Sequence, residues 1–384
     1  MVNRVFLNLT ASLLLKSVFL VCGVLLSACA EMGARYSEQE SIRFSQSKNY
    51  HSEKQVFVNQ RKNILEEMYK RIYSWKTIEQ ELFSGAEDLQ PERELVVEAL
   101  NIEAFFKDDG KAKFVWLGHS SVLIRINNVT ILVDPVFSEN ASPFPGFAKR
   151  FQNPVVNLST FPRIDAVLIS HDHYDHLDME SIEYLSAITD QFLVPLGVAA
   201  HLKYWGVNDK QIQEFDWWQA LNVSDVKFVF TPSQHTSGRG LFDHGKTLWG
   251  SWVIQHENHS LFFSGDSGYG PHFKQIGDAY GPFDIAFIES GQYNRQWREV
   301  HLQPKEWKLA YEDLKAKYYY PVHWGVFSLS SHAWYQPVEY LERNAAQINV
   351  FTSLMGEVVA LDALNINANN CWQRFIALAH ANCE

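Results

Sequence analysis

The sequence predicts an α/β domain with a helical extension at its N-terminus, and three observations support this fold class. Short apolar runs rich in β-branched residues, such as residues 165–169, have the length and composition of buried strands. Segments with helical spacing, such as residues 179–188, lie between such runs. Several runs end at a histidine or an aspartate, which is where open α/β sheets place their chemistry. With 384 residues, of which 46% are hydrophobic, the chain can bury such a core.

Residues 1–29 have the composition of an export signal. The apolar run 17–26 is too short to span a bilayer comfortably, but it suits the hydrophobic part of a signal peptide. The ending Leu26-Ser27-Ala28-Cys29 resembles a bacterial lipobox, which implies that Cys29 is lipidated and begins the mature chain. Because Ala30 follows rather than an aspartate, we expect an exported lipoprotein on the periplasmic face of the outer membrane. An ordinary signal peptide with a coincidental cysteine is the alternative.

The segment 30–113 is charged and polar and carries no chemical motif. We expect an exposed tether after Cys29 and then a helical extension that packs on the main domain, because residues 56–83 show helical periodicity. At the other end, residues 362–384 form a predicted tail that holds Cys371 and Cys383. Whether these two cysteines pair in an oxidising compartment stays open.

The main domain is expected to begin with strands at Phe114. Residues 114–117, 121–126 and 129–133 predict an antiparallel meander with short turns. Asp134 ends the last of these strands, and we expect it to hydrogen-bond the histidines of a site rather than to bind a metal directly. His119 is assigned a similar supporting role. The irregular segment 137–157 is long enough to be functional and is a candidate for lining a substrate cleft.

The densest group of chemical residues follows the predicted strand 165–169, in the run His171-Asp172-His173-Tyr174-Asp175-His176. Two histidines two positions apart on an extended segment can bind one cation, and the next two ligands can reach a second after the chain turns. Asp178 is the expected N-cap of the helix 179–188. Chance clustering on a solvated loop is the alternative, which delivery by a buried strand disfavours.

Three later strands each end at a further candidate ligand, since residues 226–232, 261–265 and 318–322 lead to His235, Asp266 and His323. The predicted ligand sets are His171, His173 and His235 for one ion, Asp175, His176 and His323 for the other, and Asp266 as the bridge. Imidazole and carboxylate donors without thiolate suit two Zn²⁺ ions, although Fe or Mn also fits. Two such ions would lower the pKa of a shared water toward ~7 and so provide a hydroxide at neutral pH.

These ligands and their spacing resemble the metallo-β-lactamase superfamily. The blocks Asp216-Trp217-Trp218, Phe230-Thr231-Pro232-Ser233-Gln234-His235 and Val322-His323-Trp324-Gly325 are more closely similar to the N-acylphosphatidylethanolamine-hydrolysing phospholipase D family and its bacterial relatives. The match spans about residues 114–361. The resemblance implies a four-layer αβ/βα sandwich, two zinc ions, and cleavage of an amphiphilic phosphodiester into phosphatidic acid and an N-acylethanolamine.

The resemblance also suggests that His301 lies near the metals and protonates the leaving alkoxide. With Asp175 it is a candidate catalytic residue, whereas a surface histidine at the start of a helix is the alternative. Val300 and residues 236–240 depart from the family pattern near the expected headgroup pocket. The resemblance therefore predicts the type of bond that is cleaved better than it predicts the identity of the substrate.

The net charge and the cysteine content disfavour several other functions. The net charge of -11 and the lack of a basic run argue against nucleic acid as a partner and against a ribonuclease. A lactonase or β-lactamase of the same fold is an alternative, although one common type of zinc β-lactamase needs a cysteine and none lies between Cys29 and Cys371. A non-catalytic, lipid-anchored envelope protein is another, but it would have no physical need to keep all seven ligands. A homodimer stays open.

Overall fold

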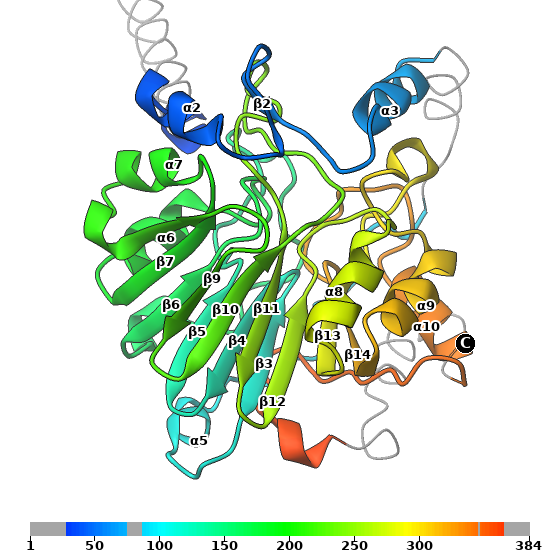
Figure 1. Cartoon of the computed structure of the whole chain (residues 1–384). Helices are drawn as coiled ribbons and strands as arrows, with labels where there is room; N and C mark the ends of the chain where they lie inside the picture. The colour runs from blue at the N-terminus through cyan, green and yellow to red at the C-terminus, as the bar shows by residue number, and fades with distance from the viewer. Residues whose placement is uncertain (1–27, 75–86, 345, 365–384) are drawn as a thin grey trace, which may run out of the picture.

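The computed structural model describes residues 28–74, 87–344 and 346–364. Two β-sheets pack face to face, and helices cover their outer faces, so that the layers run helix, sheet, sheet, helix (Figure 1). The predicted four-layer αβ/βα sandwich is confirmed. None of the helices in these ranges is both long enough and apolar enough to cross a bilayer.

The first sheet has seven strands in the order β15-β3-β4-β5-β6-β7-β8. Their bounds are Lys113–Gly118 (β3), Ser121–Ile126 (β4), Val129–Val133 (β5), Ile164–Leu168 (β6), Thr189–Pro195 (β7), Ile212–Phe215 (β8) and Val359–Ala360 (β15). The antiparallel meander β3–β4–β5 is as predicted, and β5 to β8 continue in parallel. The helices α6 (Met179–Leu185) and α7 (Ala199–Tyr204) connect the parallel strands, which explains why β6 is apolar on both faces.

The second sheet has six strands in the order β14-β13-β12-β11-β10-β9. Their bounds are Ala220–Val223 (β9), Val226–Thr231 (β10), Ser251–His256 (β11), His259–Phe263 (β12), Phe283–Glu289 (β13) and Ala316–Val322 (β14). Its outer helices are α8 (His272–Tyr280), α9 (Pro304–Asp313) and α10 (Gln336–Arg343). The predicted strands are β10, β12 and β14, and the sequence reading did not anticipate β13, which lies between the last two.

The core between the sheets is built by the alternation of side chains along each strand. Phe114 and Trp116 of β3 point inward, and the Phe114 ring lies 5.1 Å from Phe287 and 5.2 Å from Tyr320 of the opposite sheet. Val115 and Leu117 point the other way, into a second core shared with α6 and α7. This packing fixes the strand register, so the residues that follow each strand are held on a rigid scaffold.

The N-terminal extension differs from the prediction. Its elements are α2 (Glu38–Phe44), β1 (Tyr50–His51), β2 (Val56–Phe57), α3 (Ile64–Ile72) and α5 (Ile102–Phe106). The helix predicted from residue 56 is wrong at its start, because Phe57 packs 5.5 Å from the Phe44 ring and its N–H donates to the carbonyl of Gly245. Tertiary packing therefore overrides the local periodicity, and residues 75–86 lie outside the described part.

The exposed tether expected after Cys29 is also incorrect. Trp205 Nε1 donates to the carbonyl of Ala30 at 2.9 Å, and the Ala34 N–H donates to His201 Nδ1 at 3.2 Å. Residues 30–36 therefore lie against the α/β domain. Cys371 and Cys383 lie outside the described residues.

Two smaller expectations need correction. Asp178 occupies the N-cap position of α6, but its carboxylate does not cap the helix. It accepts hydrogen bonds from the N–H groups of Phe137 and Ser138 instead, which fixes the start of the irregular segment 137–157. The residues that line the cavity above the histidine cluster do not include that segment, so in the described structure it does not line that cleft.

Candidate metal centre

The structure brings all seven predicted ligands together. Each follows the carboxyl end of a strand, since β6 leads to the run 171–176, β10 to His235, β12 to Asp266 and β14 to His323. Their donor atoms form two groups, in each of which all atoms lie within 4.8 Å of one another. Ligands from both sheets therefore meet at one edge of the sandwich.

The first group holds His171, His173, His235 and Asp266. His171 Nε2 lies 3.0 Å from His173 Nδ1, and His235 Nε2 lies 3.2 Å from the same atom. Asp266 Oδ2 is 3.8 Å from His171 Nε2 and 3.7 Å from His235 Nε2. Three imidazoles and one carboxylate thus converge on one point.

The second group holds Asp175, His176 and His323, and also His119, for which the sequence predicted only a supporting role. Asp175 Oδ2 lies 3.1 Å from His323 Nε2 and 3.6 Å from His176 Nε2. Asp266 reaches this group too, because its Oδ1 lies 3.2 Å from His176 Nε2. Asp266 therefore lies between the two groups, where a bridging ligand would have to lie.

The supporting residues lie where the sequence placed them. Asp134 accepts hydrogen bonds from the Ser170 N–H at 2.7 Å and from His176 Nδ1 at 2.7 Å, so the histidine presents Nε2 to the cluster. His119 Nε2 lies 3.0 Å from Asp175 Oδ2. His235 Nδ1 donates to the Val300 carbonyl at 2.9 Å, which orients that ring in the same way.

Three residues of the site have a strained backbone conformation. His119, Asp134 and His323 all have positive φ, at 49°, 40° and 69°. Residues other than glycine rarely adopt this backbone region, and they keep such a conformation only where surrounding contacts hold it. The fold therefore maintains costly conformations in order to aim these three side chains.

The electrostatics favour bound cations. Burial alone would raise the pKa of Asp175, but His176, His119 and His323 lower it well below its usual value. Burial and the neighbouring imidazoles lower the pKa of His171 well below 6.5. Ionised carboxylates and neutral imidazoles are the forms that bind metals.

His176 behaves differently, and the reason supports the same conclusion. Burial would lower its pKa, but Asp266, Asp175 and Asp134 together raise it well above the ordinary value. Three carboxylates converging on one ring favour a positive charge there. His176 Nε2 and Asp266 Oδ1 are both buried and lie 3.2 Å apart, but neither forms a well-directed hydrogen bond within the described residues. The donor set therefore fits a dinuclear site for Zn²⁺ or a similar divalent ion.

Glu289 is the residue that the sequence reading missed. It ends β13, is buried, and its carboxylate accepts a hydrogen bond from His301 Nδ1 at 2.7 Å. Its other oxygen accepts the N–H groups of Ser267 and Leu302. Only the four residues 285–288 before this carboxylate are apolar without a break, because Asp284 interrupts the run, and the sequence reading did not recognise the strand.

His301 lies close to the cluster, with Nδ1 3.9 Å from Asp266 Oδ2. A cavity of about 190 Å³ opens above it and is lined by His173, Asp175, Asp266, Gln292, Trp297, His301, His323 and Leu329. Burial would lower the pKa of His301, but Glu289 and Asp266 raise it to about 9. The surface position considered for His301 is therefore not found.

Comparisons with known proteins agree with this geometry. A family model described as Beta-lactamase superfamily domain matches residues 129–324. A protein of Mycobacterium tuberculosis named as uncharacterized is 42% identical over 239 residues, which cover 61% of this chain and 64% of that protein. The chain thus spans less than two thirds of the length of this relative.

A second relative and a solved structure add to this. The N-acyl-phosphatidylethanolamine-hydrolyzing phospholipase D 1 of Caenorhabditis elegans is 31% identical over 267 residues, covering 65% of this chain and 75% of that protein. The structure of an isothiocyanate hydrolase from Delia radicum gut bacteria aligns with a TM-score of 0.54 at 15% identity, covering 65% of this chain and 98% of that one. That likeness concerns the fold alone. The chain belongs to the β-lactamase superfamily and has the metallo-β-lactamase fold.

Proposed function

We propose that this protein is a dinuclear zinc hydrolase, and specifically a phosphodiesterase of phospholipase D type. Its substrate would be a lipid similar to N-acylphosphatidylethanolamine, cleaved to phosphatidic acid and an N-acylethanolamine. The observation that carries the proposal is the convergence of seven imidazole and carboxylate donors from both sheets, with Asp266 between the two groups. Without a metal, so many buried ionisable groups would be a cost to the fold.

The metal-binding residues divide the work. His171, His173 and His235 would hold one cation, and Asp175, His176 and His323 the other. When bound, two such cations supply Lewis acidity, which activates water and neutralises charge on a phosphoryl oxygen. Asp266 would set the spacing of the pair, while Asp134 and His119 keep the ligands oriented.

His301 is the proposed general acid. Hydrolysis adds the oxygen of water to phosphorus and breaks the bond to the ethanolamine oxygen, which must leave with a proton. His301 Nδ1 donates to Glu289, so its other ring nitrogen is left for the cavity. Cations near Asp266 would lower the raised pKa of His301 toward neutrality, where proton donation is most effective.

A lipid substrate is supported by the relatives and by the cavity. The Caenorhabditis elegans relative is named for hydrolysis of N-acyl-phosphatidylethanolamine. The cavity over the cluster combines the apolar side chains of Leu329 and Trp297 with the amide of Gln292. Such a lining accepts a group that is polar at the phosphate and apolar beyond it.

The proposed location is the periplasmic face of an outer membrane, through lipidated Cys29. Cys29 is exposed and unpaired, and the residues that follow it lie directly on the domain. The catalytic unit would therefore lie close to its membrane, as an enzyme acting on lipids requires.

The test is product analysis from a mixed phospholipid extract. Purified protein with measured zinc content is incubated with the extract, and the products are identified by mass spectrometry. We expect phosphatidic acid and N-acylethanolamine from the unmodified protein and from a His259→Ala control, which changes a histidine far from the cluster. His235→Ala should form neither product. Products equal in amount with His235→Ala, or hydrolysis of lactones alone, would refute the lipid assignment, and absence of bound metal would refute the enzyme.

A further inference from the structure

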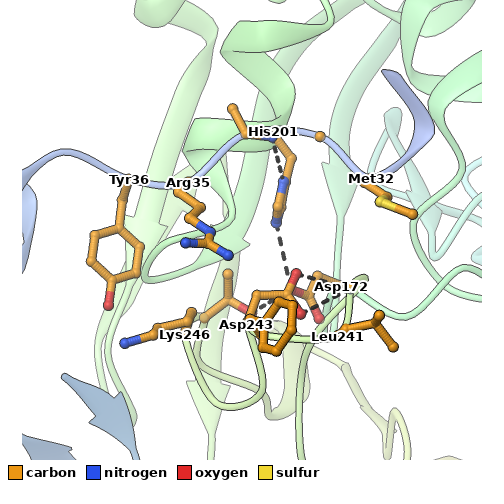
Figure 2. Close-up of a pocket in the computed structure, with 13 residues that line it drawn as sticks. Met32, Arg35, Tyr36, Asp172, His201, Leu241, Asp243 and Lys246 are labelled. Atoms are coloured by element: carbon orange, nitrogen blue, oxygen red, sulfur yellow. Dashed lines mark hydrogen bonds and ion pairs between the residues drawn. The ribbon is translucent and has the colours of Figure 1, made fainter. Parts of the chain in front are cut away.

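A second cavity lies on the far side of the histidine run, where the chain enters the domain. It has a volume of about 330 Å³, and its lining comes from residues 32–36, the loop 240–247, Asp172 and His201. Figure 2 shows His201 pointing down from the helix toward Asp172, with Arg35 and Lys246 on one side and Leu241 on the other. We call this the entry pocket. It shares no lining residue with the cavity over the metal ligands.

Two cations of the entry pocket have no carboxylate partner among the residues that the structure describes. Arg35 forms no ion pair within these ranges. Lys246 Nζ donates to two main-chain carbonyls of the described part, those of Gln55 at 2.8 Å and Lys54 at 3.4 Å. Burial and then the neighbouring Arg35 lower the pKa of Lys246, as expected for two uncompensated positive charges side by side.

The two carboxylates of the pocket, Asp172 and Asp243, keep their charge, but neither forms an ion pair with Arg35 or Lys246 in the described part of the chain. Asp243 accepts the N–H groups of Arg239 and Gly240. Asp172 accepts from the Gly238 N–H and from the Thr247 hydroxyl, both at 2.7 Å. The side of the pocket at Arg35 and Lys246 is therefore the part that offers cations to an anion, because no carboxylate pairs with either of them there.

The rim of the pocket is apolar and unusually exposed. Leu241 is 82% exposed and Phe242 79%, the highest values among large hydrophobic side chains in the described residues. Met32 adds a third apolar side chain to the lining. Exposed apolar side chains that rim a charged pocket are expected where a protein meets a lipid surface.

The place where the N-terminal segment meets the domain indicates that the entry pocket faces the membrane. Residues 28–31 are helical and Cys29 is exposed. Met32 and Arg35 follow Cys29 closely in the chain. Arg239 fixes this entry by donating twice to the carbonyl of Glu31, at 3.0 and 2.8 Å. A chain anchored ahead of residue 30 must therefore hold the entry pocket at the membrane.

We propose that the entry pocket binds the phosphate headgroup of an anionic phospholipid, with Arg35 and Lys246 on the phosphate and Leu241 and Phe242 in the acyl region. The cavity of about 330 Å³ lies within the range of small-molecule sites and would hold the headgroup while the acyl chains stay in the bilayer. The site is separate from the metal centre. It goes beyond the proposed hydrolysis and rests on that proposal only for the membrane location.

The lipid would be bound close to the metal ligands without touching them. Arg239 Nη1 donates to the carbonyls of Asp172 and Leu177, both at 2.7 Å, on either side of the histidine run. The same guanidinium holds Glu31 at the entry. Lipid bound in the entry pocket would therefore contact residues 32–36, a segment that Arg239 already connects to the histidine run 171–176.

Native mass spectrometry of the full-length protein in a neutral detergent tests the proposal. The His235→Ala background is used, so that turnover does not complicate the result. Phosphatidylglycerol and phosphatidylcholine with identical acyl chains are added separately, and bound lipids are counted by mass. We expect one phosphatidylglycerol per chain in preference to phosphatidylcholine. Arg35→Gln should weaken this binding roughly tenfold, because charged contacts at a lipid surface dominate the selectivity.

Matched variants keep the test decisive. Arg35→Lys should retain binding, and Arg343→Gln, on the exposed face of α10, should leave it unchanged. Leu241→Ser with Phe242→Ser should weaken binding, while Phe147→Ser, 70% exposed elsewhere, should not. Equal retention of both lipids, or binding indifferent to Arg35→Gln and to the Leu241 and Phe242 changes, would overturn the proposal. Displacement of the lipid by inorganic phosphate alone would show that the pocket binds free phosphate instead.

Discussion

Asp266 is the side chain that both halves of the metal cluster share. Its Oδ2 lies 3.3 Å from His323 Nε2 and its Oδ1 3.2 Å from His176 Nε2, while Oδ2 also faces His171. Asp266→Asn keeps the shape and removes the charge, so neither ion would be fully neutralised. We predict loss of at least one of two bound metals, measured by elemental analysis of purified protein. Asp225→Asn, outside the cluster, is the control, and full metal content in Asp266→Asn would contradict the bridging role.

Asp134 gives a prediction of a different kind, because it touches no proposed metal. Its two oxygens accept from Ser170 and from His176 Nδ1. An asparagine has one acceptor oxygen, so Asp134→Asn would point an NH₂ group at one of these donors. We predict metal affinity roughly 10- to 100-fold weaker, the usual effect of losing such a partner. Competition with a chelator measures it, and an unchanged affinity would show that Asp134 serves only the fold.

The convergence of the seven candidate ligands could be predicted because each follows an apolar strand in the sequence. Glu289 could not be separated from other acidic residues in the same way, since β13 was not recognised and its place beside β14 arises only in the sheet. Arg239 and Asp172 were missed for a related reason. Their partners are main-chain carbonyls and residues far along the chain, which no spacing reveals.

At the scale of elements, the entry segment 30–36 should respond to pH. Burial, followed by the Asp178 carboxylate, raises the pKa of Glu31 to about 7. Protonated Glu31 is therefore favoured when the segment is docked. The docked state of residues 30–36 becomes less stable as pH rises from about 4.5 to 7. Above that range its stability does not change further through this group.

Hydrogen exchange checks this prediction. After correction for the intrinsic rate, protection of residues 30–36 should fall between pH 5 and 8, by less than the full pKa shift would give, because solvent screens the partly exposed Glu31. Glu31→Gln should remove that dependence, whereas Glu38→Gln, exposed on α2, should keep it. A pH slope that is the same in Glu31→Gln and the unmodified protein would rule out this titration.

The elements of the extension were the least predictable part of the fold. Residues 56–57 join a two-stranded sheet because the Phe57 ring packs against Phe44 and Tyr50. Helix α3 begins only after Asn63, which has a positive φ of 64°. These contacts are between separate segments, so helical periodicity alone misleads. The strands of the main domain were predicted better, because covered strands are apolar throughout.

At the scale of the whole molecule, the candidate metal centre joins the two sheets. The run 171–176 belongs to the first sheet, whereas His235, Asp266 and His323 follow strands of the second. Cations bound between them would crosslink the two layers of the sandwich. Removing the cations leaves Asp175 and Asp266 as buried carboxylates whose charge the neighbouring histidines must offset by taking up protons.

We therefore predict that metal removal lowers the unfolding temperature. A ligand present at 100 times its Kd stabilises the folded state by about 2.7 kcal/mol. For a domain of this size that corresponds to a fall of roughly 5–10 °C on chelation. Calorimetry before and after chelation, with zinc restored in a third scan, measures the effect. Asp266→Asn should show a smaller fall, because it has less metal to lose. An unchanged transition after confirmed loss of metal would mean that packing between the sheets, and not the cations, holds the ligand loops in place.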